Sequence, residues 1–454
     1  MEGAYSKKIQ QFNGNRYWYY LMVFIVTLIS SCSISHKIET QTKTILLSDP
    51  IINTGHIGIS IFEPASNKYW YQLNGDKYFI PASDTKLFTA YAAMKYLGDS
   101  LIGLKYQQSD STLEIYPCGD PSFLHPDFKQ QPVFDFLNRQ HKIIYHPQRF
   151  VHTIGMGWAW DDYLEKYMVQ RSELPLYGNL IRIIKKDSLL SVNPSSIHVE
   201  FIKNREGFFK DTMHYAERRW NTNDLLVADA NKDSLKENYE IPLVADWQNM
   251  VTFLQDTLHQ KIRISDRLDI DSNKIAGDNL KIIFSQPTDS LLKPMLFNSD
   301  NFFAEQCLLM VSNKQLGFMG VGEIIDTLLK SCFKDIPQKP RWVDGSGLSR
   351  YNLFTPASFV YVLAKMKTEF GEDRLKRILP TGGEGTLKNY YLQDANFVFA
   401  KTGSMSNQAT ISGLLYTRKG KLLLFSILVN QFIGSGTSVR HTVEKYLEDI
   451  RAKY

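Results

Sequence analysis

Residues 83–86 have the sequence Ser83-Asp84-Thr85-Lys86 and lie where a strand-and-turn region meets the helical pattern of Thr85–Leu97. Residues three apart share one face of a helix, so the amine of Lys86 can lie beside the hydroxyl of Ser83. A serine is a weak nucleophile until a base removes its proton, and a desolvated lysine can be that base. Because so short a pattern arises readily by chance, alone it favours a helix cap followed by a surface lysine.

Two more short patterns follow along the chain. Ser299-Asp300-Asn301 precedes the apolar helical stretch Phe302–Val311, where alone it indicates an N-cap. Lys401-Thr402-Gly403-Ser404 follows the strand-like Phe397–Ala400. A lysine and hydroxyls at a strand edge suit a carboxylate ligand, and Gly403 allows close approach of a substrate backbone. The alternative for this pattern is a solvated strand end and turn.

Taken together and in this order, the three patterns are far more specific than any one of them. S-x-x-K, S-D-N and K-T-G are the signature of the penicillin-recognising serine hydrolases, which the chain resembles. Ser299 follows Ser83 by 216 residues, and Lys401 follows Ser299 by 102. The first gap is much longer than in class A β-lactamases, which indicates an insertion. The chain is similar to the D-alanyl-D-alanine carboxypeptidase/endopeptidases of the low-molecular-mass class C penicillin-binding proteins, whose extra domains lie in this gap.

Further stretches match that family. They are Gly119-Asp120-Pro121-Ser122, Trp160-Asp161-Asp162, Asp344-Gly345-Ser346-Gly347-Leu348-Ser349-Arg350 and Gly385-Thr386-Leu387. The chain departs from the family at Pro117-Cys118, at Ser404, where threonine is common, and over about Lys186–Asn279, where no motif matches. These departures concern substrate preference and leave the hydrolytic residues intact.

The resemblance implies acyl transfer without a metal or organic cofactor. Ser83 would be the nucleophile, Lys86 its base, Ser299 a proton relay, and Asn301 would position the lysine and the substrate amide. The expected substrate-binding residues are Lys401, Thr402, Gly403, Ser404, Arg350, Asp161 and Asp162, with the backbone N–H groups of Ser83 and Ser404 as the oxyanion hole. Peptidoglycan stem peptides would be the substrates, and β-lactams would acylate Ser83.

Two other functions stay open at this point. A β-lactamase needs fast deacylation, and no E-x-x-L-N-type element in a suitable place favours it. A catalytically silent penicillin-binding sensor or scaffold is the alternative of another class, although the chain has every side chain of the signature. The sequence leaves open the balance between carboxypeptidase and endopeptidase activity, the stem-peptide preference and the oligomeric state.

The predicted fold is α/β (α+β), with a β-lactamase/transpeptidase-like catalytic domain and a large, mainly β insert. In His56–Glu63 the isoleucines alternate with other residues, which predicts a strand with one buried face. Strands and helices are also predicted near the C-terminal end, over Phe397–Ala400, Ala409–Thr417, Leu422–Asn430 and the last amphipathic helix. The predicted domains are 51–105 with 282–454 for the catalytic unit and 106–281 for the insert.

The N-terminal region resembles an export signal. A basic stretch precedes the apolar run Tyr17–Ile29, whose about 13 residues fall short of the roughly 20 that span a bilayer. Ile29-Ser30-Ser31-Cys32 resembles the bacterial lipobox, so residues 1–31 would be removed and Cys32 lipidated. The alternative is a buried N-terminal helix with an incidental cysteine. Residues 32–50 are polar without a clear period, which predicts a tether. Together with the lipobox-like segment, this predicts a periplasm-facing lipoprotein anchored to a bacterial envelope membrane, either the inner or the outer one.

Composition and the remaining cysteines argue against a nucleic-acid-binding protein and against a metal site built from cysteines. The 454 residues include 52 Lys and Arg against 47 Asp and Glu, and a net charge of +5 is weak for a nucleic-acid binder of this size. Cys118, Cys307 and Cys332 have no metal-like spacing. A Cys307–Cys332 disulfide stays open.

Overall fold

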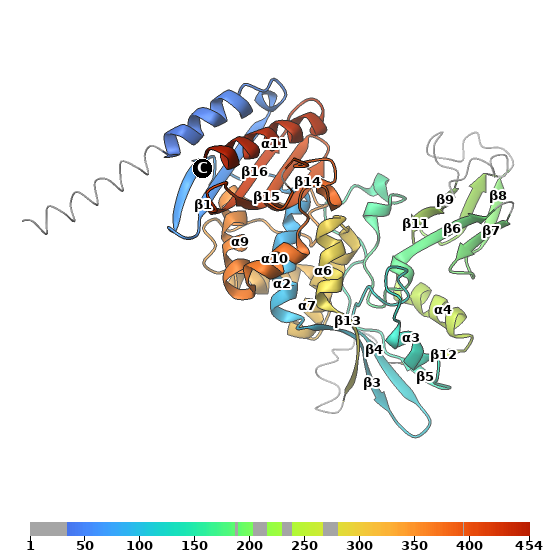
Figure 1. Cartoon of the computed structure of the whole chain (residues 1–454). Coiled ribbons are helices and arrows are strands. Elements are labelled where there is room, and N and C mark those ends of the chain that lie inside the picture. Colours follow the sequence, from blue (N-terminus) through green and yellow to red (C-terminus); the bar gives the residue numbers. More distant parts are fainter. Residues whose placement is uncertain (1–33, 187–188, 203–215, 229–237, 267–279, 394) are drawn as a thin grey trace, which may run out of the picture.

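The computed structural model describes residues 34–186, 189–202, 216–228, 238–266, 280–393 and 395–454 (Figure 1). The predicted signal segment 1–31 and the lipidation residue Cys32 lie outside these residues. Within the described ranges, no helix has both the length and the apolar character needed to cross a membrane.

The central sheet joins the two ends of the described chain. Its strand order is β14-β15-β16-β1-β2, and all neighbouring strands are antiparallel. The strands are β1 (His56–Glu63), β2 (Lys68–Leu73), β14 (Val398–Met405), β15 (Gln408–Tyr416) and β16 (Leu422–Asn430). Because β1 pairs with β16 in register from His56 to Phe62, the N-terminal strands complete a sheet that the C-terminal strands begin.

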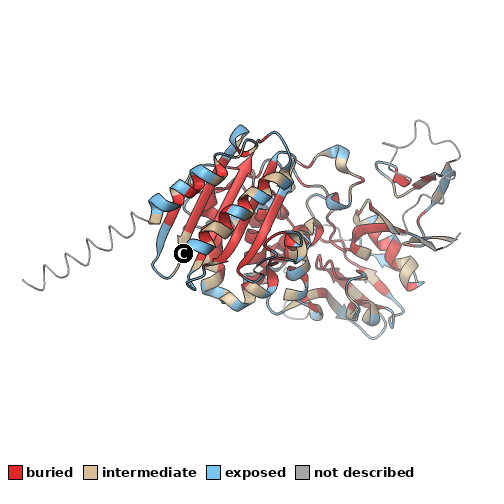
Figure 2. Ribbon diagram, turned by 45° about the horizontal axis from the view of Figure 1, so that its top comes forward, coloured by how far each residue is buried: buried red, intermediate tan, exposed pale blue. Residues whose placement is uncertain are grey.

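The prediction that β1 buries only one face is wrong. Ile57, Gly58, Ile59, Ser60 and Ile61 are all buried, because helices cover the sheet on both sides (Figure 2). A Cβ on Gly58 would lie 2.5 Å from the ring of Phe79. The small residues that alternate with the isoleucines therefore mark a close approach of packed elements, and not a face towards water.

Helices form a layer on each side of this sheet (Figure 1). α11 (Gly436–Lys453) covers one face, with Val439, Val443, Leu447 and Ile450 buried as the amphipathic pattern predicts. The other layer holds α2 (Lys86–Tyr96), α6 (Thr288–Phe297), α7 (Asn301–Leu316), α8 (Val321–Lys330), α9 (Pro356–Phe370) and α10 (Glu372–Ile378). α7 is buried from Phe302 to Asn313 and lies at the centre of this layer's hydrophobic core.

Residues 34–49 correct the predicted tether. Residues 34–41 are helical and continue into η1 (Thr42–Leu46), a π-helical turn that packs against α11. Thr42 Oγ1 lies 2.9 Å from the hydroxyl oxygen of Tyr446, and Ile38 and Leu46 are fully buried. The apolar residues are few, but Ile38 and Leu46 are eight residues apart, with Thr42 midway between them, so all three lie on one helical face. α11 offers the apolar surface that covers this face.

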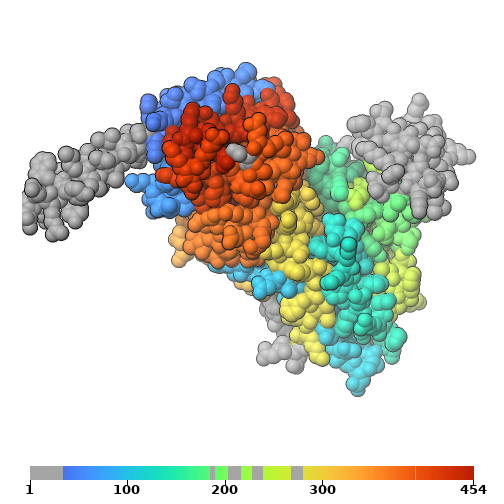
Figure 3. Space-filling view, viewed as in Figure 1, coloured from blue at the N-terminus to red at the C-terminus, as the bar shows by residue number. Residues whose placement is uncertain are grey.

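Three further sheets among the described residues consist of strands of the insert and of β3 and β13, which flank it, and this part of the chain lies to one side of the central sheet and its helices (Figure 3). One has the order β12-β5-β4-β3-β13 and contains β3 (Ser100–Gln108), β4 (Leu113–Pro117), β5 (Ile143–Tyr145), β12 (Ile262–Ile264) and β13 (Lys281–Pro287). The others are β11-β6-β7 and β8-β10-β9, from β6 (Leu180–Lys186), β7 (Leu189–Asn193), β8 (Val199–Ile202), β9 (Ala216–Arg218), β10 (Leu225–Ala228) and β11 (Asn238–Pro242). With α3 (Pro132–Leu137) and α4 (Trp247–Leu258), they enclose a separate hydrophobic core. The domain boundaries at 105 and 282 stay a proposal.

The three cysteines of the described chain are free thiols. Cys118 and Cys307 are buried and Cys332 is partly buried. Cys307 and Cys332 therefore do not form the disulfide that the sequence left open. The burial of Cys307 follows from its place on α7, which is enclosed by other helices.

Candidate active site

Ser83 and Lys86 lie at the start of the helix that the sequence predicts. Ser83 is in η3 (Ala82–Thr85), a 3₁₀ turn that leads directly into α2. Lys86 is fully buried, and its Nζ donates to Ser83 Oγ at 2.9 Å. The same Nζ donates to Asn301 Oδ1 at 2.6 Å and to the carbonyl oxygen of Ser346 at 2.7 Å. The structure thus brings the S-x-x-K and S-D-N motifs together.

The partners of Lys86 decide what its neutral form can do. Burial lowers the pKa of Lys86 to about 8, although nearby Asp300, Asp344, Glu305 and Asp84 oppose this shift, in that order. Two of its three partners, the amide oxygen of Asn301 and the carbonyl of Ser346, can only accept hydrogen bonds. Once a proton is lost, the two remaining N–H bonds serve these acceptors and the lone pair faces Ser83 Oγ.

Ser299 and Lys401 form a second contact between motifs. Lys401 Nζ donates to Ser299 Oγ at 3.0 Å and to the carbonyl oxygen of Thr402 at 2.5 Å. Burial, aided by the charge of Lys86, lowers the pKa of Lys401 well below its usual value. Ser299 has φ 61°, and Asp300 caps α7 by accepting from Phe303 N at 2.9 Å. This tight turn aims Ser299 at the site while α7 begins normally.

Gly403 sets the distance between β14 and the Ser83 turn. A Cβ at this position would lie 2.7 Å from the carbonyl oxygen of Pro81 and 2.9 Å from the backbone nitrogen of Ser83. Thr410 on β15 donates to the same Pro81 carbonyl at 2.9 Å. The strand therefore lies directly against the nucleophile's turn because residue 403 has no side chain.

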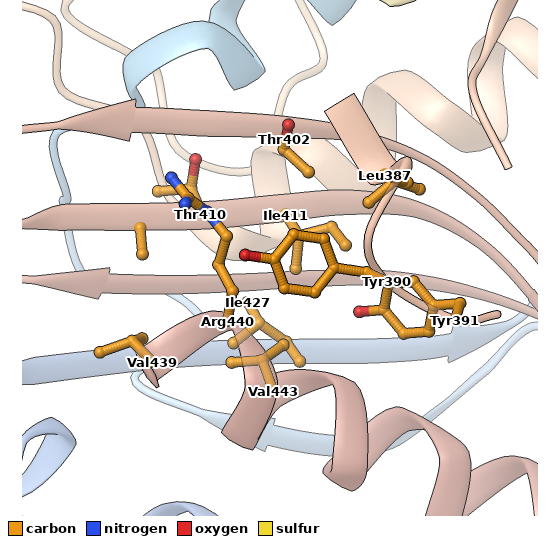
Figure 4. Close-up of a pocket in the computed structure, with 11 residues that line it drawn as sticks. Leu387, Tyr390, Tyr391, Thr402, Thr410, Ile411, Ile427, Val439, Arg440 and Val443 are labelled. Atoms are coloured by element: carbon orange, nitrogen blue, oxygen red, sulfur yellow. The ribbon is translucent and has the colours of Figure 1, made fainter. Parts of the chain in front are cut away.

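Arg440 is a residue of this region that the sequence reasoning missed. It is on α11, and its Nη2 donates to Ser404 Oγ. Figure 4 shows Arg440 reaching from α11 across the sheet towards Thr410, beside a narrow pocket of about 20 Å³ that Thr402 also lines. Its position in an amphipathic helix gives no sign of this contact, which depends on how α11 crosses the sheet.

The other predicted site residues lie at different distances from this centre. Asp161 and Asp162 are in η4 (Trp160–Asp162), where Asp161 is exposed and Asp162 is half-buried. Asp162 hydrogen-bonds the hydroxyl of Tyr167, and the carbonyl of Tyr167 accepts from Asn301 Nδ2 at 2.8 Å. Arg350 is exposed, and no hydrogen bond or ion pair among the described residues joins it to the three motifs.

A cavity of about 480 Å³ adjoins the S-D-N segment. Residues 298–302 form one wall, and residues of the insert, among them Lys166, Tyr167, Arg182 and Glu240, form the other. A space of this size next to Ser299 and Asn301 can hold part of a peptide. The sequence did not indicate it, because its walls come from several separate segments between residues 125 and 302.

Comparisons with known proteins agree with this geometry. Residues 40–454 match the D-Ala-D-Ala carboxypeptidase 3 (S13) family. The chain is 23% identical over 428 residues to the D-alanyl-D-alanine carboxypeptidase DacB of Haemophilus influenzae, and the aligned region covers 84% of this chain and 86% of that protein. It is 31% identical over 166 residues to the carboxypeptidase DacB of Mycolicibacterium smegmatis, which covers 34% and 36%.

Solved structures show the same fold. The crystal structure of penicillin binding protein 4 from Haemophilus influenzae has a TM-score of 0.68 at 18% identity and covers 91% of this chain and 98% of that one. A second structure of that protein, complexed with a β-lactam, has a TM-score of 0.59 at 16% identity and the same coverage. The predicted α/β class and the predicted kind of catalytic fold are thereby confirmed.

Proposed function

We propose that this chain, which belongs to the D-Ala-D-Ala carboxypeptidase 3 (S13) family, hydrolyses peptidoglycan stem peptides through an acyl-enzyme on Ser83. The resemblance drawn from the three motifs is confirmed by this membership, and the chain is a serine D-Ala-D-Ala carboxypeptidase. The observation that carries the proposal is the arrangement around Lys86. Its two acceptor-only partners direct the amine's lone pair at Ser83 Oγ.

Acylation follows from these contacts. Ser83 Oγ attacks the carbonyl carbon of the bond before the last D-alanine, and Lys86 takes the hydroxyl proton. Backbone N–H groups of Ser83 and Ser404 stabilise the oxyanion, and losing one such donor typically costs about 10²–10³ in rate. Ser299, which accepts from Lys401, passes a proton to the leaving amine. The peptide bond breaks, D-alanine leaves, and water then hydrolyses the ester on Ser83.

The terminal carboxylate of the substrate would bind at β14. Lys401 contributes an amine that donates hydrogen bonds, Thr402 and Ser404 contribute hydroxyls, and Gly403 leaves space for the substrate backbone. Arg440 adds a guanidinium to this group through Ser404. A carboxylate is the ligand that such a set of donors favours.

Penicillin acylation is the direct test of Ser83. Intact-mass measurement after treatment with fluorescent penicillin should show a single adduct, which Ser83→Ala removes and Ser109→Ala, an exposed serine in the β3–β4 turn, retains. An adduct that survives Ser83→Ala would refute the nucleophile. The β-lactam complex of the related Haemophilus protein supports this choice of probe.

Turnover separates this function from its alternatives. Release of D-alanine from a D-Ala-D-Ala peptide is expected, whereas a silent sensor would form the penicillin adduct and release nothing. A β-lactamase would free itself of the adduct within seconds. Digestion of purified crosslinked muropeptides, with the products identified by mass, would measure endopeptidase against carboxypeptidase activity.

The insert is proposed to tune the substrate. Asp161 and Asp162 lie outside the catalytic centre, and Asp162 connects to it through Tyr167 and Asn301. A carboxylate there can bind the free amine of a diamino acid in the stem peptide, a contact of roughly 1.5–3 kcal/mol. The alternative is that these aspartates hold the η4 turn in place. Arg350 stays a proposed substrate-binding residue on its motif alone.

Export and lipid anchoring are proposed from the N-terminal sequence. Residues 1–31 would be removed and Cys32 would carry the lipid, so that the enzyme reaches peptidoglycan from an envelope membrane. Because residues 34–49 pack on α11, little chain remains between Cys32 and the folded domain. The catalytic unit would then lie close to the membrane surface, without a long tether.

A further inference from the structure

The carbonyl of Ser346 is a structural requirement of the catalytic centre. It is one of the two acceptor-only partners that orient Lys86, at 2.7 Å from Nζ. The backbone N–H of the same residue donates to Glu305 Oε1 at 2.7 Å. Glu305 is on α7, four residues after Asn301, so both residues lie on one face of that helix. Asn301 on this face accepts directly from Lys86, and Glu305 holds Ser346, whose carbonyl is the other acceptor.

Glu305 is in turn held by a residue of the insert. Arg171 Nε donates to Glu305 Oε2 at 2.8 Å, and Arg171 Nη2 lies 2.7 Å from the same oxygen. The side chains are 5% and 0% exposed, so both charges are buried. The guanidinium also lies over the ring of Trp158, 5.1 Å from its centre.

A second contact from the insert reaches the same loop. Trp158 Nε1 donates to Asp344 Oδ2 at 2.9 Å. Asp344 also accepts from the backbone nitrogens of Gly347 at 2.9 Å and Ser349 at 2.6 Å. The loop that presents the Ser346 carbonyl is therefore held by two buried carboxylates, and each of them contacts the insert.

We propose that the Arg171–Glu305 ion pair is a positioning device for the catalytic lysine, through which the insert holds Ser346 and thereby orients Lys86 towards Ser83. The proposal rests on Lys86 being the base. It extends the role of the insert from substrate preference to the chemistry of acylation. Both side chains are buried, so both act through Ser346.

The charge of Glu305 gives this role a signature that packing alone lacks. Asp300, Asp344, Glu305 and Asp84 oppose, in that order, the lowering of the pKa of Lys86. Burial raises the pKa of Asp84 to about 7, and the neighbouring amine of Lys401 has a pKa well below its usual value. Neutralising Glu305 should lower the pKa of Lys86 further. Because acylation needs the free amine, its rate would then begin to rise at a lower pH.

The test measures the second-order rate of penicillin acylation between pH 5 and 10, with the melting temperature of each protein. Glu305→Gln should move the midpoint of the rising limb down by roughly 0.5–1 unit, less than the one to three units of a directly contacting charge. It should also lower the plateau rate about 10- to 100-fold, since Ser346 is less firmly held. Arg171→Gln, which leaves Glu305 without the side chain that holds it, should lower the plateau rate in the same way.

Two further variants separate positioning from stability. Arg171→Lys keeps the charge and should keep the wild-type midpoint. Asp289→Asn/Arg374→Gln neutralises a bidentate pair between α6 and α10 and should change neither midpoint nor plateau. If either single variant fails to fold, Arg171→Gln/Glu305→Gln carries the test, because it leaves no buried charge without a partner.

The outcomes are distinct. A lower midpoint in Glu305→Gln, together with a lower plateau in the Gln variants and the wild-type midpoint in Arg171→Lys, supports the proposal. An unchanged midpoint in Glu305→Gln, or a wild-type plateau in the Gln variants, overturns it and leaves the pair a structural ion pair, whether or not the melting temperature falls. A wild-type enzyme that penicillin does not acylate at Ser83 at any pH would instead refute the proposed function.

Discussion

Replacement of Gly347 by alanine should strongly slow acylation, because the added Cβ would clash with the turn that carries Ser83. Gly347 has φ 82° and lies against the turn that carries the nucleophile. A Cβ there would lie 1.8 Å from the carbonyl oxygen of Ala82 and 2.8 Å from Thr85 Oγ1. Since ordinary contact begins at 3.4 Å, one of the two backbones must move by about 1.6 Å.

The expected size follows from that displacement. Ala82 precedes Ser83 and itself has φ 47°, so its turn is already in a sparsely populated conformation. A misplacement of about 1 Å can cost 10²-fold in rate, so we expect acylation by Gly347→Ala to fall at least about 100-fold. The positive φ and the overpacking together should lower the free energy of unfolding by about 2–5 kcal/mol.

Gly420→Ala is the matched control. Gly420 has φ 76°, but a Cβ there would have no atom within 4 Å. It should therefore lose only the cost of the positive φ, about 1–2 kcal/mol, and keep the wild-type acylation rate. Stopped-flow acylation and thermal unfolding of both variants compare the two. Acylation by Gly347→Ala within threefold of the wild-type rate would refute the view that this close approach holds the Ser83 turn.

Three other predictions use different features. The acylation rate should rise with pH with a midpoint near 8, since burial lowers the pKa of Lys86 to about that value and only the neutral amine accepts the proton; a rate that is flat from pH 6 to 10 would contradict this. Cys32→Ala should abolish metabolic labelling with a fatty acid and release the protein from the membrane fraction, and unchanged labelling would dispose of the lipobox. Asp162→Asn should lower kcat/KM for stem peptides with a free amine but leave acetylated D-Ala-D-Ala peptides and penicillin nearly unaffected; equal losses on all three, with a lower Tm, would assign Asp162 to stability.

The parts of the site that the sequence predicted are those that local rules determine. The i, i+3 spacing of Ser83 and Lys86 already implies their contact, and Asp300 is the N-cap that its position before Phe302–Val311 indicated. The C-terminal strands and α11 were also predicted, because the strands are mostly apolar runs and the apolar residues of α11 recur at helical spacing over its length. Motif order then placed elements 216 and 102 residues apart in one centre, which no periodicity could do.

The parts that were missed depend on long-range packing. The 34–49 segment has too few apolar residues to stand out from a polar linker, and only α11 explains why they are enough. Arg440 reaches Ser404 because α11 crosses the sheet at that point. Gly58 looked like a solvent-facing position, because a glycine gives the same pattern whether water or a phenylalanine ring lies beside it.

The polar residues of α7 show how function departs from the hydrophobic pattern. A helix buried from Phe302 to Asn313 would be more stable with apolar side chains throughout, since a buried ion pair seldom repays its desolvation. Glu305 is nevertheless fully buried in it, and its oxygens serve Ser346 and Arg171. Burial alone would lower the pKa of Lys86 further, and a weaker base would remove the Ser83 proton less readily. The buried carboxylates therefore limit how far burial lowers the pKa of Lys86, so that the amine can be neutral and still be a strong enough base. Their burial costs stability, which the large apolar core around α7 can offset.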